Sequence, residues 1–242
     1  FAMITFSSFV SSITNLMTHM RSLRSVEAKM FSKLEHFLQH HSVSFMTSMR
    51  VRRYLERTVK QQRSCPVERD VELLGKLSMP LLIELHAEIY SPVLTAHPFL
   101  HDYQQLNLPA LQKICHTAVK EVSFSKGDVV FSNGDSAAYV HFPVKGLLEY
   151  KGEAVHGGSH EIESSGTWVA EMSLWCYWNY KGILISKTEA TLMQLDSAGF
   201  HHVVLHSKAG QHEAAAWAVS AVREMNEIDR SFWTDIDPLL VV

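Results

Sequence analysis

The chain has 242 residues, of which 22 are basic and 25 acidic, so its formal net charge is −3. This length fits one domain with an appended helical region better than two full domains. A nearly neutral balance gives no global reason to expect nucleic acid or an anionic membrane as a partner. The three cysteines, Cys65, Cys115 and Cys176, fit neither a disulfide framework nor a paired metal site, which indicates a reducing setting.

The fifteen histidines do not predict a metal site. Two pairs, His40-His41 and His201-His202, are adjacent in sequence, and a helix points adjacent side chains about 100° apart. That geometry is poor for two ligands of one metal ion. We therefore expect no metal.

The first twenty residues carry no charge and are rich in Ser and Thr. Such a run is just long enough to span a bilayer, although spanning segments are usually more apolar. Its hydroxyl residues suit contacts between helices or a wet pore, and Arg21 and Arg24 follow it as a cytoplasmic flank. A buried soluble helix is one alternative. A signal peptide is disfavoured because the positive charges follow the apolar run.

Residues 25–63 predict two consecutive amphipathic helices, because their apolar residues recur at spacings of three and four. Between these helices, Ser42 or Ser44 is available as the N-cap of the second. The second helix is basic over Arg50–Arg63, which suits calmodulin or acidic lipid as a partner. A solvated face or a salt-bridge surface between subunits is the simpler alternative. A break at Cys65-Pro66 ends this helix.

Short helices are predicted next, over 68–77 and 81–90. Pro80 stands near the start of the second, where its missing N–H costs nothing. Pro92 and Pro98 then mark the way into the following domain.

From Val119 onward the apolar period changes to two, and glycine-containing turns recur at intervals of roughly eight to twelve residues. This pattern predicts a small antiparallel barrel or sandwich. Strand character returns over 182–195, and two helices close the chain at 200–206 and 211–226. The turns fall at Gly127, Gly134, Gly146 and Gly157-Gly158.

The segment KGDVVFSNGDSAAYVHFPVKGLLEY at 126–150 resembles the cyclic-nucleotide-binding domain of hyperpolarisation-activated, cyclic-nucleotide-gated and ether-à-go-go-type channels. Its glycine turns match those of the family, and Tyr139 with Phe142 matches one of its strands. Upstream, LLGKLSMPLLIELHAEIYSPVLTAHPFL at 73–100 resembles the helical linker of these channels. The resemblance covers nearly the whole chain and is weakest over 151–165.

This resemblance implies an α+β fold in which a helical C-linker precedes an antiparallel, jelly-roll-like β-roll flanked by helices. It also implies a homo- or hetero-tetrameric voltage-gated or cyclic-nucleotide-gated-type cation channel, potassium-selective or non-selective, at the cytoplasmic face of a membrane. The resulting division is 1–20 for the cytoplasmic end of the last pore-lining helix, 21–96 for the C-linker, 97–230 for the roll and 231–242 for a tail.

In nucleotide-binding members of the family, a Phe-Gly-Glu motif opens a short helix whose N–H groups hold the cyclic phosphate. The Glu binds the ribose, and an Arg further along pairs with the phosphate. Here Ala170 replaces the glycine, Glu171 keeps the carboxylate, and Tyr180, followed by Lys181, stands where the arginine is expected. The resemblance also assigns Met172, Ser173, Glu161 and Glu163 to this pocket.

These substitutions predict a degenerate pocket, with neither cyclic AMP nor cyclic GMP as a cofactor. Losing a charge-assisted hydrogen bond costs about 1.5–3 kcal/mol, and Glu161 and Glu163 stand where apolar side chains face the purine. A total of roughly 4 kcal/mol weakens a micromolar site about a thousandfold. The alternative is a genuine cyclic-nucleotide sensor in which Lys181 binds the phosphate as a point charge.

Ether-à-go-go-type channels resemble this chain in having a degenerate pocket, which residues after their last helix fill as an intrinsic ligand. The corresponding stretch here is 231–237, with Phe232, Trp233 and Asp235 as the candidate residues. One hypothesis is that the two aromatic side chains occupy a purine-shaped slot. Ordinary packing of these aromatics on the domain is the alternative.

The leading expectation for function is a regulatory and tetramerisation module in which four linkers form a ring and the rolls bias opening of the pore. A soluble cyclic-nucleotide sensor is expected to carry a second roll, an inhibitor segment or a helix-turn-helix, and none is visible. No Gly-rich phosphate loop, nucleophile elbow or metal-spaced His/Glu set indicates an enzyme.

Overall fold

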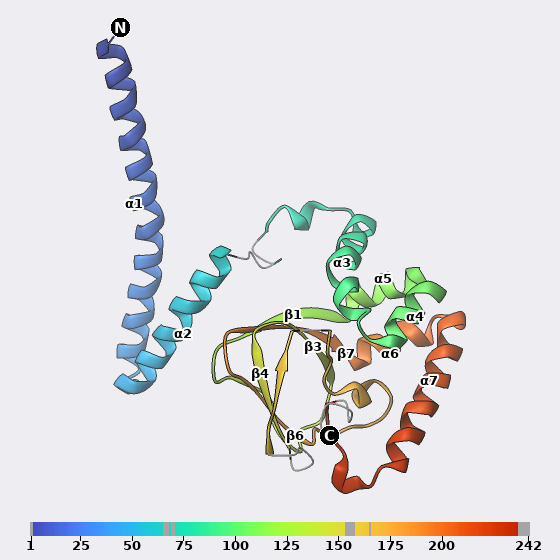
Figure 1. Ribbon diagram of the computed structural model, residues 1–242. Helices are drawn as coiled ribbons and strands as arrows, with labels where there is room; N and C mark the ends of the chain where they lie inside the picture. Colours follow the sequence, from blue (N-terminus) through green and yellow to red (C-terminus); the bar gives the residue numbers. More distant parts are fainter. Residues whose placement is uncertain (1, 65–67, 69–70, 153–157, 165, 237–242) are drawn as a thin grey trace. The chain divides into compact units, whose positions relative to one another are not determined.

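A computed structural model describes residues 2–64, 68, 71–152, 158–164 and 166–236 of the chain. Within these ranges the protein combines helices with antiparallel sheet, so the predicted α+β class is confirmed (Figure 1). The chain divides into two compact units, residues 1–71 and 72–242. The second unit thus takes in the end of the segment that the sequence assigned to the linker.

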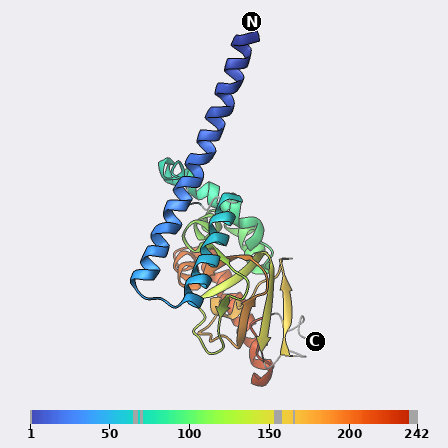
Figure 2. The same cartoon turned by 90° about the vertical axis from the view of Figure 1, so that its left-hand side faces the viewer.

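The first unit consists of α1 (Ala2–His40) and α2 (Phe45–Ser64), joined as a hairpin (Figure 2). In the turn, the Ser44 hydroxyl accepts a hydrogen bond from the Thr47 N–H at 3.3 Å, which confirms Ser44 as the cap. The sequence separated residues 1–20 from the helix that follows, but α1 continues through both, because no Gly or Pro interrupts it. Among the described residues, no helix combines the length and the apolarity needed to cross a membrane.

The second unit begins with η2 (Leu74–Lys76), α3 (Met79–Leu94), α4 (Pro98–Leu106) and α5 (Leu108–Thr117). Pro80 lies in the first turn of α3, as predicted. The predicted end of this helix near residue 90 was too early, because α3 runs on through Pro92. The buried side chains of Tyr90 and Leu94 stabilise this last turn against the loss of one helical hydrogen bond.

The residues described between Val119 and Asp196 form two antiparallel sheets, with strand orders β1-β7-β3 and β2-β6-β4-β5. The predicted change of period is confirmed, because β1 begins at Val119. Gly146 has a φ of +94°, and a Cβ there would collide with the carbonyl of Glu189, so this turn requires glycine. The strands are β1 (Val119–Phe124), β2 (Val129–Phe131), β3 (Tyr139–Lys145), β4 (Leu147–Gly152), β5 (His160–Glu163), β6 (Gly182–Ser186) and β7 (Ala190–Asp196).

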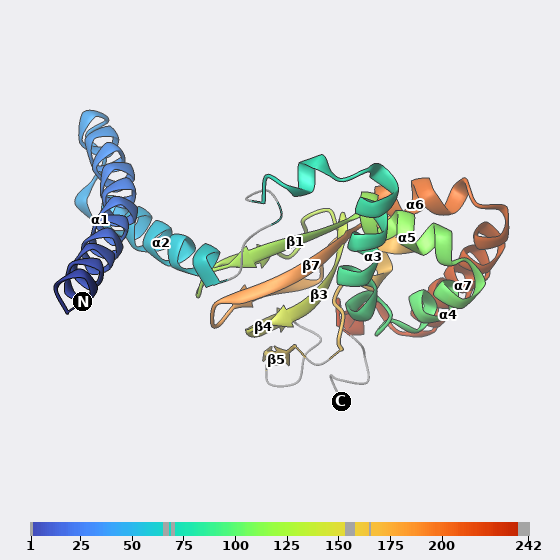
Figure 3. The ribbon, with the colours of Figure 1, turned by 90° about the horizontal axis from the view of Figure 1, so that it is seen from above.

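The short helix η4 (Glu171–Leu174) connects β5 to β6, and α6 (Ser197–Leu205), α7 (Lys208–Glu227) and η5 (Arg230–Phe232) follow the sheets. Helices α4 to α7 lie together at one end of the strands (Figure 3). One apolar cluster joins these helices to β3 and β7, and a second fills the space between the sheets. Ile236, from the tail, belongs to the second cluster, so this tail residue is part of the packed core.

Candidate functional site

The segment before η4 forms a strained turn against β3. Val169 and His141 exchange two backbone hydrogen bonds of 2.9 and 3.0 Å. Ala170 then adopts the left-handed conformation, with φ 66° and ψ 40°. This conformation costs a non-glycine residue roughly 1–2 kcal/mol, so the surrounding contacts must stabilise the turn. One such contact is the Ala170 N–H, which donates to the backbone carbonyl of Asp235 at 2.6 Å.

The carboxylate of Asp235 lies in a site built from four hydrogen-bond donors. The Trp178 indole N–H donates to Oδ1 at 2.7 Å, and the Tyr150 hydroxyl donates to Oδ2 at 2.9 Å. The backbone N–H groups of Lys181 and Gly182 donate to Oδ2 at 2.7 and 3.1 Å. Asp235 is only 5% exposed, so these donors replace its water shell. The arrangement is an anion site that the chain fills with its own side chain.

This anion site contains neutral donors rather than a cation. The Lys181 ammonium lies over the indole rings of Trp178 and Trp233, 4.6 and 5.5 Å from their centroids. Burial raises the pKa of Asp235 above its ordinary value, and the hydrogen bonds from Trp178, Lys181 and Tyr150 oppose this shift without cancelling it. Burial, together with the nearby Asp235 carboxylate, also raises the pKa of Tyr150. Its hydroxyl therefore stays protonated and serves as a donor.

Gly182 allows the two backbone donors to reach Asp235. A Cβ at this position would collide with the Lys151 carbonyl and the Tyr150 ring. Without a side chain at Gly182, β6 approaches β4 closely, and the N–H groups of Lys181 and Gly182 point at the carboxylate. The glycine is therefore needed for close approach rather than for a positive φ.

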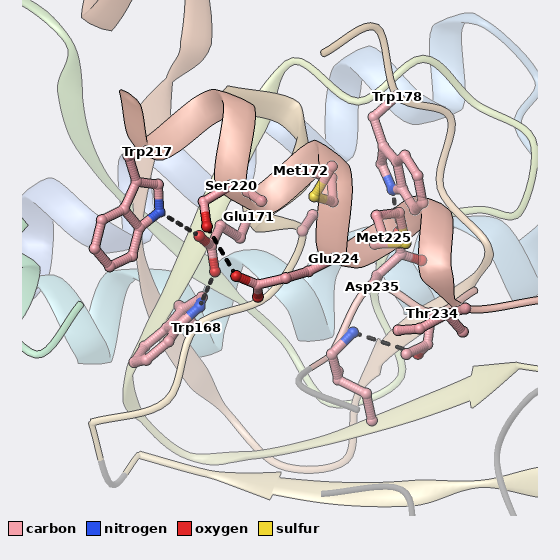
Figure 4. A pocket seen from close by; sticks show the side chains of 14 residues that line it. Trp168, Glu171, Met172, Trp178, Trp217, Ser220, Glu224, Met225, Thr234 and Asp235 are labelled. Atoms are coloured by element: carbon pink, nitrogen blue, oxygen red, sulfur yellow. Dashed lines mark hydrogen bonds between the residues drawn. The ribbon is translucent and has the colours of Figure 1, made fainter. Parts of the chain in front are cut away.

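Glu171 lies in a second cluster, in which aromatic side chains surround a carboxylate. The Trp168 indole N–H donates to Oε2 at 3.0 Å, and Trp175 and Trp217 donate to Oε1 at 3.0 and 3.4 Å. His97, fully buried at the start of α4, places its Nε2 3.1 Å from Oε1. Figure 4 shows Trp168 and Trp217 on either side of the carboxylate. Glu171 thereby connects η4 to the entry of α4 and to α7.

The electrostatics of this cluster favour an ionised Glu171. Burial by itself would raise the pKa of the carboxyl group. The contacts with His97, Trp175 and Trp168 outweigh burial and lower the pKa of Glu171 from 4.5 to about 2. The carboxylate is therefore charged at neutral pH and already bonded within the protein, which leaves it poorly placed to bind a ribose.

A cavity of about 440 Å³ lies between α7 and the segment 168–172 (Figure 4). It separates the Glu171 cluster from the Asp235 site, and both carboxylates contribute to its wall. Its lining residues are Trp168, Ala170, Glu171, Met172, Trp178, Trp217, Ser220, Ala221, Glu224, Met225, Ile228, Thr234, Asp235 and Ile236.

Only part of the residue set expected from the sequence meets at this cavity. Ala170, Glu171 and Met172 line it together with Asp235. Ser173 is buried behind the turn, where its hydroxyl lies 3.2 Å from that of Ser197.

Neither Tyr180 nor Lys181 places a positively charged side chain at the cavity, where a phosphate would need one. Tyr180 belongs to the apolar cluster between the two sheets, stacked on Phe131 with ring centroids 3.8 Å apart, and its hydroxyl lies 3.1 Å from His141 Nε2. Lys181 contributes its backbone N–H to the site, while its ammonium covers indole rings. The site therefore has backbone N–H donors for an anion but no cationic side chain at the position where the sequence predicted one.

Glu161 and Glu163 lie on β5, away from the main cavity. Both border a separate hollow of about 230 Å³. The Glu161 carboxylate pairs with Lys187 at 2.6 Å. The carboxylates expected to face a purine therefore contribute no charge to the wall of the main cavity.

The tail enters the site through Asp235 and not through its aromatic residues. Phe232 is 64% exposed, and the Trp233 indole N–H donates to the carbonyls of Met225 and Ile228 at 3.1 and 3.2 Å. The expectation that both aromatics occupy the slot needs correction, because neither lines the cavity. Trp233 instead satisfies carbonyl groups left open at the end of α7.

Sequence reasoning missed several residues of the site, namely Tyr150, Trp178, His97 and Trp217. A buried indole needs an acceptor for its N–H, and this chain has several tryptophans near Glu171 in sequence. Several tryptophans close together in sequence therefore indicated a buried acceptor such as a carboxylate. They did not indicate which carboxylate would be bound.

The basic stretch of α2 is described only in part. Arg52 pairs with Glu35 and Glu56 of the same chain. The salt-bridge surface between subunits and the calmodulin or acidic-lipid partner stay predictions. The side chains of Arg57, Lys60 and Arg63 lie outside the described residues, as do Cys65, Pro66 and the tail beyond Ile236.

In the part of the chain that the structure describes, no three His, Cys, Asp or Glu side chains gather as metal ligands. The candidate site is therefore defined by the self-filled anion site, the Glu171 cluster and the cavity between them. No protein-family model matches the chain, and no curated protein is significantly similar to it.

Proposed function

We propose that this chain is the cytoplasmic regulatory and tetramerisation region of a cation-channel subunit, potassium-selective or non-selective. In this proposal, α1 includes the cytoplasmic end of the last pore-lining helix, the helices through α3 form the C-linker, and the sheets form a cyclic-nucleotide-binding-type roll. The role is regulatory and not catalytic. The roll biases the pore without a bound nucleotide.

The observation that carries the proposal is the Asp235 carboxylate in its four-donor site. Backbone N–H groups at the start of a strand are typical donors to a phosphate oxygen, and here they bind a side chain of the same protein. The sequence resemblance assigns Tyr180 and Lys181 to phosphate contact. A nucleotide would have to displace Asp235 and would then find no arginine to pair with its phosphate.

The surface of the first unit supports the tetramerisation part of the proposal. Large apolar side chains on α1 and α2 are exposed within a single chain, including Met30, Phe37, Phe45, Met46 and Met49. Met30 and Phe37 are seven positions apart and so share one face of α1, and an exposed apolar face is typical of surfaces that contact another protein. Neighbouring copies of the same helices are the partners that a ring of linkers supplies.

Calorimetric titration with cyclic AMP and cyclic GMP, alongside sedimentation, tests both parts of the proposal. We expect no heat up to millimolar nucleotide, and sedimentation as a tetramer. Micromolar binding would replace the proposal with the alternative of a genuine cyclic-nucleotide sensor, and Lys181→Ala would then test its phosphate contact. A monomer at all concentrations would contradict the assembly role.

A second experiment tests coupling to a pore. The chain is fused after the last pore-lining helix of a voltage-gated potassium channel that lacks its own cytoplasmic region. We expect the fusion to shift the voltage of half-activation, and Asp235→Asn to change that shift, because the variant weakens the self-filled site. Equal half-activation voltages with and without the chain would contradict a gating role.

A further inference from the structure

The cavity beside α7 has a chemical character opposite to that of a nucleotide site. Its volume of about 440 Å³ falls within the range of small-molecule sites. The charged side chains in its wall, Glu171, Glu224 and Asp235, are all carboxylates, and no basic residue belongs to the described lining. A phosphate placed here would meet three carboxylates and no basic side chain in the described lining, whereas a cation would be attracted.

The tryptophans of the wall add a second attraction for a cation. The indole N–H groups of Trp168 and Trp217 donate to Glu171, and that of Trp178 donates to Asp235. A ring whose N–H is bonded to a carboxylate gains electron density, which strengthens its attraction for a positive charge at its face. These N–H groups are occupied, so a ligand meets the rings as π surfaces and not as donors. Because the Lys181 ammonium already lies over Trp178, Trp168 and Trp217 are the rings offered to a ligand.

Glu224 is the carboxylate best placed to contact a ligand directly. It is exposed on α7, and its Oε1 accepts a hydrogen bond from the Ser220 hydroxyl at 3.0 Å (Figure 4). A carboxylate offers about four acceptor positions, so most of those on Glu224 remain open among the contacts of the described residues. Glu171 and Asp235 are each bonded to several protein donors and act mainly through their charge.

From this lining we propose that the cavity binds an organic cation, an ammonium group carrying an apolar, ring-sized substituent. The ammonium faces Glu224 and the indole of Trp217, and the apolar part lies against Met172 and Met225. Thioether side chains adapt readily to ring-shaped ligands. The inference goes beyond the proposed regulatory function and does not depend on it, because it rests on the cavity wall alone.

The test is a titration of the full chain with benzyltrimethylammonium chloride, followed by calorimetry and tryptophan fluorescence. Neutral benzyl alcohol and anionic benzenesulfonate serve as comparison ligands of similar size. We expect saturable binding of the cation alone, weakening as salt is raised, because the sites of attraction are charged. Equal binding of benzyl alcohol, or no saturation by the cation, would overturn the proposal.

Variants on α7 locate the binding. Ala221→Phe fills the cavity without changing its charge and should abolish binding, with Ala221→Val as a smaller filling if the first variant does not fold. Glu224→Gln should weaken binding about two- to five-fold, the range of an exposed charge pair. Glu227→Gln, on the same helix but outside the cavity, is the matched control and should bind like the unaltered chain. Unchanged affinity in a folded cavity-filling variant would overturn the proposal.

Discussion

The two units of the chain bury their apolar surface to different extents. In the second unit, residues distant in sequence meet in a packed interior, as when Asp235 bonds to Tyr150 across 85 positions. In the first unit, α1 and α2 leave large side chains such as Phe37 and Met46 exposed. The second unit therefore specifies its structure through its own packed interior, whereas the helical hairpin has apolar surface that its two helices do not cover themselves.

The largest effect is expected from breaking the Asp235 site. Asp235→Ala leaves four donors without their acceptor in a buried position, which should lower the free energy of unfolding of the second unit by about 4 kcal/mol. Urea titration followed by tryptophan fluorescence measures this loss. Asp102→Ala, at an exposed position of α4, is the control and should change stability by less than about 0.5 kcal/mol. If Asp235→Ala lowered the free energy of unfolding no more than the control does, the four donors would not stabilise the fold through Asp235.

The next effect is a pH dependence that originates in Glu171. Because folding lowers the pKa of Glu171 from 4.5 to about 2, its contribution is full above pH 4.5 and is lost as the pH falls toward 2. A shift of this size corresponds to roughly 3 kcal/mol. Urea titrations at a series of pH values measure the free energy of unfolding. The difference in this free energy between the unaltered chain and Glu171→Gln should shrink as the pH falls from 4.5 toward 2.

Other carboxylates also titrate in this pH range, so the comparison needs a control. For Glu163→Gln, at an exposed position of β5, the free energy of unfolding should differ from that of the unaltered chain by the same amount at every pH. A constant gap between the unaltered chain and Glu171→Gln from pH 5 to pH 2 would show that Glu171 has an ordinary pKa.

A third prediction concerns the apolar surface of the first unit. Phe37→Ser should weaken self-association at least ten-fold, because burying a side chain of this size contributes about 1.5–3 kcal/mol. Sedimentation over a range of concentrations measures the change. Val129→Ser, at an exposed apolar position of β2, should leave assembly unaltered. The reverse pattern would move the contact surface to the second unit.

The smallest effect should come from relieving the strained turn. Ala170→Gly removes the cost of a left-handed conformation and should stabilise the second unit by about 1 kcal/mol, equivalent to a rise in Tm of roughly 2–4 °C. Thermal unfolding followed by circular dichroism measures the rise. Ala138→Gly, at a position without a positive φ, should instead lower the Tm. A lower Tm for Ala170→Gly would indicate that the alanine methyl group contributes packing that exceeds its strain.

Local signals in the sequence predicted much of the fold. The turn glycines, the onset of strands at Val119, the cap at Ser44 and the first-turn position of Pro80 all depend on a few neighbouring residues. The continuity of α1 was missed because a change in composition near Arg21 was interpreted as a boundary. A helix continues across a change in composition unless Gly or Pro interrupts its backbone.

The candidate site depends on distant partners, and these were harder to predict. A buried indole demands an acceptor, but the sequence offers 25 acidic residues and does not say that Trp217 bonds to Glu171. Phe232 and Trp233 were chosen because their rings match a purine in shape. The hydrogen-bond donors of the site instead bind a carboxylate. The tail residue that fits such donors is Asp235.

The position of Asp235 has a consequence for synthesis on the ribosome. Gly182, one of its donors, precedes it by 53 residues. At a translation rate of roughly 5–20 residues per second, the donors are made about 3–10 s before their acceptor. During this interval the backbone donors of Lys181 and Gly182 lack their acceptor, and translation of one aspartate supplies it.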